Sequence, residues 1–191
     1  MGIDERKNAL RENIKERLKK LNEWERDSKS LVISKNLKSF FQQNIPHYQS
    51  QTRFILGAFA PIQAEVDLFK TPFGNEALKW AFPDYEDGKM VFRQCSYEDL
   101  EVTAVFGVEL SSPPKSYEIV TPEVLLIPGL AFTRSGVRLG RGKGFYDRYL
   151  ESYQGMKVGL CYEEQIEVDV PYDEHDIQVD FVVSDSGIFR K

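Results

Sequence analysis

The stretch EVLLIPGLAFTRSGVRLGRGKGFYDRYLESYQGMKVGLCY, residues 123–162, contains the pattern that decides the fold. It begins with a short apolar run at 123–129, which predicts a buried strand and continues into a loop rich in glycine. Helix-forming residues at 143–153 then predict a helix, and the apolar run at 156–162 predicts a second strand. A strand, a helix and another strand in this order favour an α/β fold with a largely parallel sheet.

The rest of the chain extends this alternation toward both ends. Apolar residues on one helical face predict a long amphipathic helix at 4–22, and a second helix is expected from about Ser28 to Gln43, before Pro46. Further strands are expected at 53–60, 89–95, within 100–110 and at 179–184.

Residues 64–70 contain enough helix formers to begin another helix, which Pro72 and Gly74 should interrupt. The pattern is weakest over 74–121. No internal repeat, low-complexity tract or linker divides the chain, so we expect a single domain over 1–191. Its expected architecture is a three-layer α/β/α fold with a Rossmann-like, largely parallel sheet.

The bulk composition argues against several classes of protein. With 30 acidic and 25 basic side chains the formal net charge is -5, so the surface as a whole should repel nucleic acid and anionic lipid. No stretch approaches the roughly 20 apolar residues that cross a bilayer, and the charged segment 1–20 lacks the apolar core of a signal peptide. Cys95 and Cys161 are interpreted as reduced, partly buried thiols of a cytoplasmic protein, while a disulfide between them stays open.

The segment 129–148 concentrates glycine and positive charge on this acidic chain. Five of the 13 glycines lie between Gly129 and Gly144, and Asp147 is the only acid in the segment. Its cations are Arg134, Arg138, Arg141, Lys143 and Arg148. Glycines at every second position from 140 to 144 let the backbone turn tightly, so that its N–H groups can approach an anion. A loop of this kind between a strand and a helix start favours phosphate binding.

A solvated surface turn is the alternative interpretation of the same segment, because glycine-rich turns are common. The spacing is neither that of a Walker A loop nor that of a GxGxxG fingerprint. Tyr146 is kept as a candidate ligand contact, whereas Tyr149 and Leu150 lie at a spacing typical of core packing. The coincidence of glycines, cations and a strand-loop-helix context favours the phosphate site.

At this point the chain resembles the 5-formyltetrahydrofolate cyclo-ligase family. The segment LIPGLAFTRSGVRLGRGKGFYDRYL (126–150) is similar to the signature of that family. Three shorter matches occur in the same order as in the family: KNALR (7–11), PIQAEVD (61–67) and HDIQVD (175–180). The matches together span nearly the whole chain, although residues 70–121 match only loosely.

The resemblance implies a set of site residues. An ATP site is implied at Lys7, Arg11, Arg138, Leu139, Gly140, Arg141, Gly142, Lys143, Gly144, Phe145 and Tyr146. A folate site is implied at Glu65, Arg141, Gly142, Lys143, Gly144 and Phe145, with Arg141 and Lys143 expected to act in catalysis. Two carboxylates, Asp147 and Asp176, are implied to hold Mg²⁺.

The resemblance also implies a reaction. ATP would phosphorylate the formyl oxygen of 5-formyltetrahydrofolate, and N10 would then close the ring to give 5,10-methenyltetrahydrofolate, ADP and phosphate. The expected partners are ATP and this folate, with or without a polyglutamate tail, and the chain is expected to be a monomer that binds neither nucleic acid nor membrane.

Each of the scattered matches has a structural alternative. Lys7 and Arg11 could form the solvated face of a helix, Glu65 and Asp147 could stabilise helix starts, and Asp176 could belong to a turn. Two departures from the family pattern also occur. Phe145 stands where the family usually has Tyr, and GVELSSPP (107–114) leaves the role of Glu109 unassigned.

Three other functions are compatible with parts of the pattern. A diverged enzyme could keep the ATP loop and act on another small molecule, because substrate specificity often depends on variable loops such as 70–121. A nucleotide- or phosphate-sensing module would bind without turnover, but it would gain nothing from metal carboxylates. A nucleic-acid binder conflicts with the net negative charge.

Overall fold

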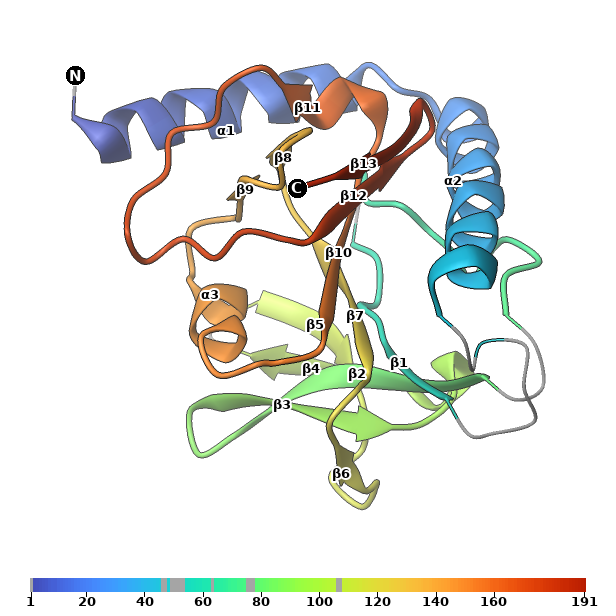
Figure 1. The fold of residues 1–191 in the computed structure, drawn as a ribbon. Coiled ribbons are helices and arrows are strands. Elements are labelled where there is room, and N and C mark those ends of the chain that lie inside the picture. The colour runs from blue at the N-terminus through green and yellow to red at the C-terminus, as the bar shows by residue number, and fades with distance from the viewer. Residues whose placement is uncertain (1, 46–47, 49–53, 63, 75–77, 106–107) are drawn as a thin grey trace.

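An eight-stranded sheet forms the centre of the computed structural model, which describes residues 2–45, 48, 54–62, 64–74, 78–105 and 108–191 (Figure 1). The strands in spatial order are β13 (Gly187–Arg190), β12 (Phe181–Ser184), β10 (Met156–Leu160), β7 (Val124–Pro128), β1 (Phe54–Gly57), β2 (Leu78–Glu86), β3 (Lys89–Gln94) and β6 (Ile119–Val120). Several positions of the sequence lie outside the described residues, among them Pro46, His47, Arg53, Gln63 and Gly107.

The five central strands of this sheet are parallel, and three antiparallel strands complete its edges. Numbered in chain order, the parallel strands run 2-1-3-4-5 from β2 to β12, which is the order of one common doubly wound fold. The expected α/β fold with a largely parallel sheet is confirmed. The strands expected at 123–129, 156–162 and 179–184 correspond to β7, β10 and β12.

Alternation along β7 explains the layers. Val124 and Leu126 belong to one hydrophobic cluster, while Leu125 and Ile127 belong to another. Successive side chains of a strand point to opposite faces, so both faces of the sheet are covered and buried. The helices α1 (Ile3–Lys19) and α2 (Glu23–Asn44) contribute to the first cluster, and α3 (Phe145–Leu150) contributes to the second. In Figure 1, α2 and α3 accordingly flank the sheet on opposite sides.

The helices differ from the sequence predictions at their ends. α2 begins five residues before the predicted Ser28 because Asn22 and Glu25 form a capping box, in which Asn22 Oδ1 accepts from the backbone N–H of Glu25 at 3.0 Å. The predicted helix at 143–153 begins after Gly144 as expected but ends at Leu150. Among the described residues no helix combines the length and the apolar character needed to cross a bilayer.

The helix predicted to begin within 64–70 is wrong, since these residues form turns. The Asp67 carboxylate accepts hydrogen bonds from the backbone N–H groups of Phe69 and Lys70, at 2.9 and 3.3 Å. Ala64 has a φ of 68°, which is incompatible with a right-handed helix. These local bonds offer the backbone an alternative to the helix.

Strand β2 lies in the segment where the sequence pattern was weakest. Its proline, Pro83, lies beyond the residues Leu78–Ala81 that pair with β1, so no parallel neighbour requires the missing N–H. The strand expected within 100–110 is a hairpin of β4 (Glu101–Val105) and β5 (Val108–Ser112).

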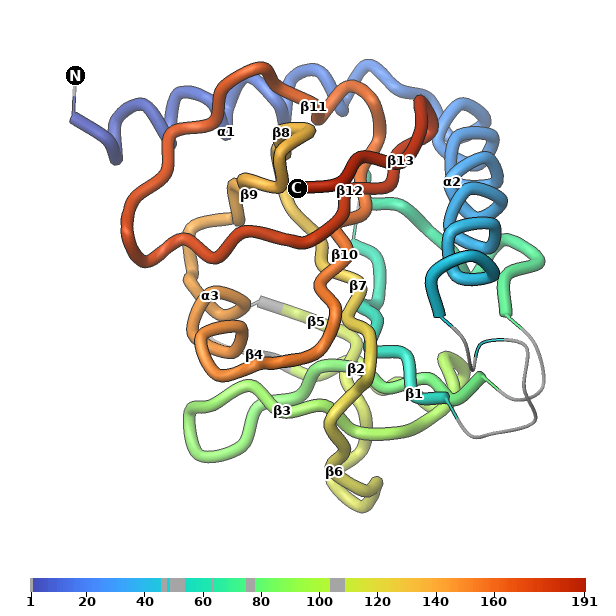
Figure 2. The backbone as a smooth tube through the Cα atoms, viewed as in Figure 1, coloured from blue at the N-terminus to red at the C-terminus, as the bar shows by residue number. Residues whose placement is uncertain are grey.

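The remaining short elements are β8 (Ala131–Thr133), β9 (Arg138–Leu139), β11 (Ile166–Glu167) and two 3₁₀ turns, η1 (Tyr97–Asp99) and η2 (Glu163–Gln165). Figure 2 shows the chain leaving β11 and running beside α1 before it turns back to β12. This loop, residues 168–180, contacts the N-terminal helix through Lys7, which binds Asp173 and Asp176. Both cysteines, Cys95 and Cys161, are buried free thiols, as expected.

Candidate active site

A cavity opens where the connections of two neighbouring strands diverge. β1 and β7 are adjacent and parallel, but the chain leaves β1 toward β2 and leaves β7 toward β10. Such a switch point, outside the carboxyl ends of the strands, is where open α/β sheets bind ligands. A cavity of about 370 Å³ lies there, which we call the apolar cavity because side chains such as Phe59, Ile62, Met90 and Phe145 line it.

Besides Asp147, one further acid lines the apolar cavity, Glu65. Its Oε1 accepts hydrogen bonds from Nε and Nη2 of Arg141, at 3.1 and 2.9 Å, and its Oε2 accepts from the backbone N–H of Ile62 at 3.1 Å. Burial nevertheless raises the pKa of the Glu65 carboxyl, against the opposing effects of Arg141 and the Ile62 N–H. The cavity therefore combines an apolar lining with one strongly placed acid, as a small-molecule site requires.

The Tyr146 hydroxyl is a further polar group on a residue that lines this cavity. Its oxygen is buried, and no described residue gives it a hydrogen bond. Burial, followed by the charge of Glu65, raises the pKa of this phenol. An unpaired buried hydroxyl costs stability, so it is a candidate for pairing with a ligand. Tyr146 lines the apolar cavity and not the second cavity described next.

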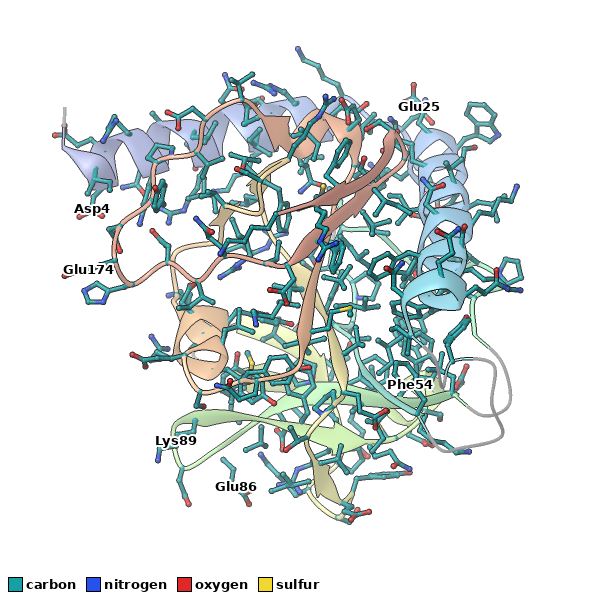
Figure 3. The ribbon with its side chains drawn as sticks, in the orientation of Figure 1. Asp4, Glu25, Phe54, Glu86, Lys89 and Glu174 are labelled. Carbon is teal, nitrogen blue, oxygen red and sulfur yellow. The ribbon has the colours of Figure 1, made fainter. Side chains whose placement is uncertain are left out.

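A second cavity, of about 420 Å³, lies between α1, α3 and the loop 168–180. We call it the polar cavity, because charged residues from these elements line it: Asp4, Lys7, Arg11, Asp147, Arg148, Glu151, Asp173, Glu174, His175 and Asp176. Figure 3 labels Asp4 on α1 and Glu174 on the loop, which lie at the same edge of the molecule.

Lys7 connects α1 to the loop at the wall of the polar cavity. Its Nζ contacts Oδ2 of Asp173 at 2.6 Å and Oδ2 of Asp176 at 2.5 Å, and its side chain is only 8% exposed. Burial alone would lower the pKa of Lys7, but the hydrogen bonds and charges of both aspartates raise it above its ordinary value. Lys7 is therefore a fixed cation at the position where the resemblance implies the nucleotide site. The alternative interpretation, in which Lys7 belongs to a solvated helix face, is wrong, because the residue is buried.

The glycine loop, residues 140–144, forms the wall between the two cavities. Gly140, Gly144 and Asp147 line both of them. Gly142 has a φ of 95° and Gly144 a φ of 65°, conformations that favour glycine. Arg11 from α1 donates from Nε to the carbonyl of Gly140 at 3.0 Å and so fixes the loop on the polar side.

Arg138 and Asp147 form an ion pair beside the glycine loop. Arg138 is buried, and its Nη2 donates to Oδ1 of Asp147 at 2.7 Å, while its Nη1 donates to the carbonyl of Pro128 at 3.2 Å. A guanidinium held in this way is not a mobile charge that could follow a phosphate. The neighbouring Leu139 is also buried, so only its backbone can serve the implied ATP site.

Lys143 and Phe145 lie on the apolar side of the loop. Lys143 is exposed, and among the described residues it forms no ion pair or side-chain hydrogen bond. The ring of Phe145 packs under the guanidinium of Arg148, whose Cζ is 5.4 Å from the ring centroid. The ring contact expected at the family's Tyr position is thus available without a hydroxyl.

The polar cavity has the donor chemistry that Mg²⁺ prefers. Asp147 and Asp176, the two carboxylates implied by the resemblance, both line it, together with Asp173. Within the described residues, however, no group of three or more His, Cys, Asp or Glu side chains could hold a metal ion alone. One or two carboxylates, completed by phosphate oxygens and water, are the usual Mg²⁺ site in phosphoryl-transfer enzymes, so the residues fit a metal that binds with a nucleotide.

Sequence reasoning did not identify the network behind the apolar cavity. Asp84 on β2 is buried and accepts from Arg93 Nε at 2.7 Å and from Lys115 Nζ at 2.8 Å. Burial would raise the pKa of Asp84, but these hydrogen bonds hold it below its ordinary value. Its neighbours Pro83 and Tyr85 line the cavity, because adjacent strand residues face opposite sides. No local motif marks such a network in the sequence.

The comparisons with known proteins point to one family. A family model described as the 5-formyltetrahydrofolate cyclo-ligase family matches residues 81–185. A 5-formyltetrahydrofolate cyclo-ligase of Mus musculus is 30% identical over 205 residues, covering 95% of this chain and 94% of the relative. One of Escherichia coli is 40% identical over 71 residues, covering 36% of this chain and 39% of the relative.

Two solved structures are similar over nearly their full length. The NMR structure of a 5,10-methenyltetrahydrofolate synthetase from Aquifex aeolicus has a TM-score of 0.77 and 30% identity, covering 96% of this chain and 92% of that one. A 5,10-methenyltetrahydrofolate synthetase from Mycoplasma pneumoniae has a TM-score of 0.69 and 23% identity, covering 94% and 98%. The second likeness supports the fold alone.

Proposed function

The chain belongs to the 5-formyltetrahydrofolate cyclo-ligase family, and on that premise we propose that it closes 5-formyltetrahydrofolate to 5,10-methenyltetrahydrofolate with ATP as the driving co-substrate. The observation that carries the proposal is the pair of cavities on either side of one glycine loop. A reaction that transfers a phosphoryl group between two bound substrates needs two adjoining sites of different character.

The apolar cavity suits the folate. Its aromatic and aliphatic lining can cover the flat pterin, and Glu65 can accept hydrogen bonds from the N–H groups of that ring. Arg141 keeps the Glu65 carboxylate oriented. The buried Tyr146 hydroxyl supplies a further hydrogen-bonding group, which we assign to the folate because Tyr146 is among the residues that line this cavity.

The polar cavity suits the triphosphate of ATP. Lys7, Arg11 and Arg148 line it and supply positive charge, and the backbone of the loop can approach phosphate oxygens at Gly142. Exposed Lys143, on the loop between the cavities, is free to follow the γ-phosphoryl group as it moves.

The reaction proceeds in two displacements. The formyl oxygen attacks the γ-phosphorus of ATP, the bond from that phosphorus to the bridging oxygen breaks, and ADP leaves. N10 of the folate then attacks the formyl carbon and loses its proton, and the C–O bond breaks as phosphate departs with the former formyl oxygen. Phosphorylation is needed because hydroxide is a poor leaving group from an amide carbon.

The protein contributes position and charge to both displacements. Lys143 and Arg141 would balance the negative charge that spreads over the moving phosphoryl group. Glu65 would hold the pterin so that the formyl group faces the glycine loop. Asp147 and Asp176 would hold Mg²⁺, which supplies charge neutralisation on the phosphates when it is bound.

A direct assay tests this function. Purified protein is mixed with 5-formyltetrahydrofolate and Mg-ATP, and the near-ultraviolet absorbance of the methenyl product is followed with time. We expect product only with ATP, and a large loss of rate in Lys143→Ala. Absence of product, with ATP still bound tightly, would reject the ring closure and leave a diverged enzyme or a nucleotide sensor.

A further inference from the structure

Asp173 is held in a single orientation by two contacts. Its Oδ2 contacts Lys7 Nζ at 2.6 Å, and its Oδ1 accepts from the backbone N–H of His175 at 2.9 Å. The backbone N–H of Asp173 in turn donates to Oδ2 of Asp176 at 2.8 Å. The loop thus presents both carboxylates to the one lysine of α1 that is buried.

Lys7 needs such support in order to serve as a phosphate ligand. A lysine side chain has a flexible four-carbon stem, so it loses considerable rotamer entropy when it is fixed. The two aspartates take two of the three N–H donors of its ammonium group, which leaves one for a phosphate oxygen. A pre-oriented ammonium binds phosphate more tightly than a mobile one, because the entropy has already been lost.

A carboxylate beside a triphosphate would by itself weaken nucleotide binding through charge repulsion. Asp173 lines the polar cavity and is 33% exposed there, so it carries this repulsion. Any favourable effect of Asp173 on ATP binding must therefore act through the Lys7 ammonium group that it holds. Asp176 has a second task in the proposed function, at the metal, whereas Asp173 is not among the residues implied for metal binding.

We propose that Asp173 is a positioning residue, which holds the Lys7 ammonium at the wall of the polar cavity for the phosphates of ATP. The inference rests on the proposed function, since it takes the polar cavity as the nucleotide site. The chain reaches this arrangement by placing the loop 168–180 beside α1, where Lys7 contacts Asp173 and Asp176.

The test measures ATP affinity by calorimetry in Asp173→Ala, Asp173→Asn, Lys7→Ala and the double variant Lys7→Ala/Asp173→Ala. We expect Asp173→Ala to weaken ATP binding about tenfold, which corresponds to about 1.4 kcal/mol. Asp173→Asn retains an oxygen acceptor for Lys7 and should bind nearly as tightly as the wild type. The double variant should bind no more weakly than Lys7→Ala, because Asp173 has nothing left to hold.

Two further comparisons separate this role from others. The loss in Asp173→Ala should persist in EDTA, since it acts through Lys7 and not through a metal ion. It should also raise the KM for ATP while kcat and the KM for the folate stay near wild type. A matched control is Asp185→Ala, which removes a similar contact to Lys29, at 2.6 Å, outside both cavities and should leave ATP affinity unchanged.

The outcomes distinguish the inference from the function on which it rests. If Lys7→Ala binds ATP as tightly as the wild type, the polar cavity is not the nucleotide site and the inference fails, whereas the ring closure is judged by the product assay. If Lys7→Ala weakens binding but Asp173→Ala does not, or if the two losses add in the double variant, only the role of Asp173 is rejected. The unfolding midpoints of all variants are measured as well, so that a loss of ATP affinity caused by a destabilised fold is recognised.

Discussion

Arg141 donates from both Nε and Nη2 to a single oxygen of Glu65, at 3.1 and 2.9 Å. The contact joins the glycine loop to the segment that follows β1, across the wall of the apolar cavity. It links residues 76 positions apart in the sequence, and it gives Glu65, whose side chain is 9% exposed, its only cation among the described residues. The orientation that we propose for the folate and the position of the loop therefore both depend on this pair.

The pair should not tolerate exchange of its arginine. Lysine cannot place two donors at the spacing of Nε and Nη2, so we expect Arg141→Lys to raise the KM for 5-formyltetrahydrofolate and to lower kcat. Arg141→Ala should have the same effects more strongly. Steady-state kinetics checks this, with Arg134→Lys as the control, because Arg134 lines neither cavity. Wild-type kinetics in Arg141→Lys would contradict the role of the paired donors.

Glu65 should destabilise the folded state as the pH rises. Its pKa is raised by burial above the ordinary value of 4.5, so the folded chain binds the proton more tightly than the unfolded chain. The carboxyl is protonated in both states well below pH 4.5, and its ionisation costs stability as the pH rises through the folded pKa. Glu65→Gln resembles the protonated form, so it should become progressively more stable than the wild type from acid to neutral pH.

Urea denaturation of both proteins at several pH values measures this difference. Glu65→Gln should at the same time lose most of its activity, since the amide has one acceptor and no charge. A stability difference that stays constant with pH would mean that the pKa of Glu65 is not raised.

The Tyr146 hydroxyl should serve the substrate and not the fold. Because no described residue pairs with it, Tyr146→Phe should leave the unfolding midpoint unchanged or slightly higher. The KM for the folate should rise on the order of five- to tenfold, the effect of one lost hydrogen bond in a buried site. Tyr149→Phe, on the same helix but outside both cavities, is the matched control. An effect confined to ATP would instead favour the nucleotide role implied by the family resemblance.

Gly142 should be required for its backbone conformation. Its φ of 95° strains any residue with a Cβ, at a cost of about 1–2 kcal/mol, and an added Cβ would lie 3.4 Å from the Arg11 guanidinium carbon. We expect Gly142→Ala to raise the KM for ATP as the loop shifts. Gly88→Ala introduces comparable strain at a φ of 76° in the β2–β3 turn, with open space around it, and should cost stability without changing ATP binding. Equal kinetics in the two variants would argue against a direct role for the loop.

The sequence predicted those parts of the molecule that depend on local patterns. The apolar runs that became β7, β10 and β12 are buried on both faces, and such strands are recognisable because nearly every residue is apolar. The glycine loop was recognisable because glycine and positive charge coincide between a strand and a helix. α2 starts earlier than the predicted Ser28, because the capping box of Asn22 and Glu25 begins the helix at Glu23.

Other parts depend on contacts that no local pattern contains. Lys7 and Asp173 are 166 positions apart, so their contact follows from the packing of α1 and not from a motif. The sequence does not distinguish Arg138 from the neighbouring cations of 129–148, yet in the structure Arg138 is buried against Asp147. The turns at 64–70 form because the Asp67 side chain competes with helix formation, which helix propensity alone does not describe.

The most direct test of the account follows the formyl oxygen itself. The enzyme is given Mg-ATP and 5-formyltetrahydrofolate that carries ¹⁸O in its formyl group, and the released phosphate is analysed by mass spectrometry. We predict one ¹⁸O atom in each phosphate released, because the formyl oxygen attacks the γ-phosphorus and departs with it. Phosphate without the label, released while the methenyl product forms, would contradict phosphorylation of the formyl oxygen.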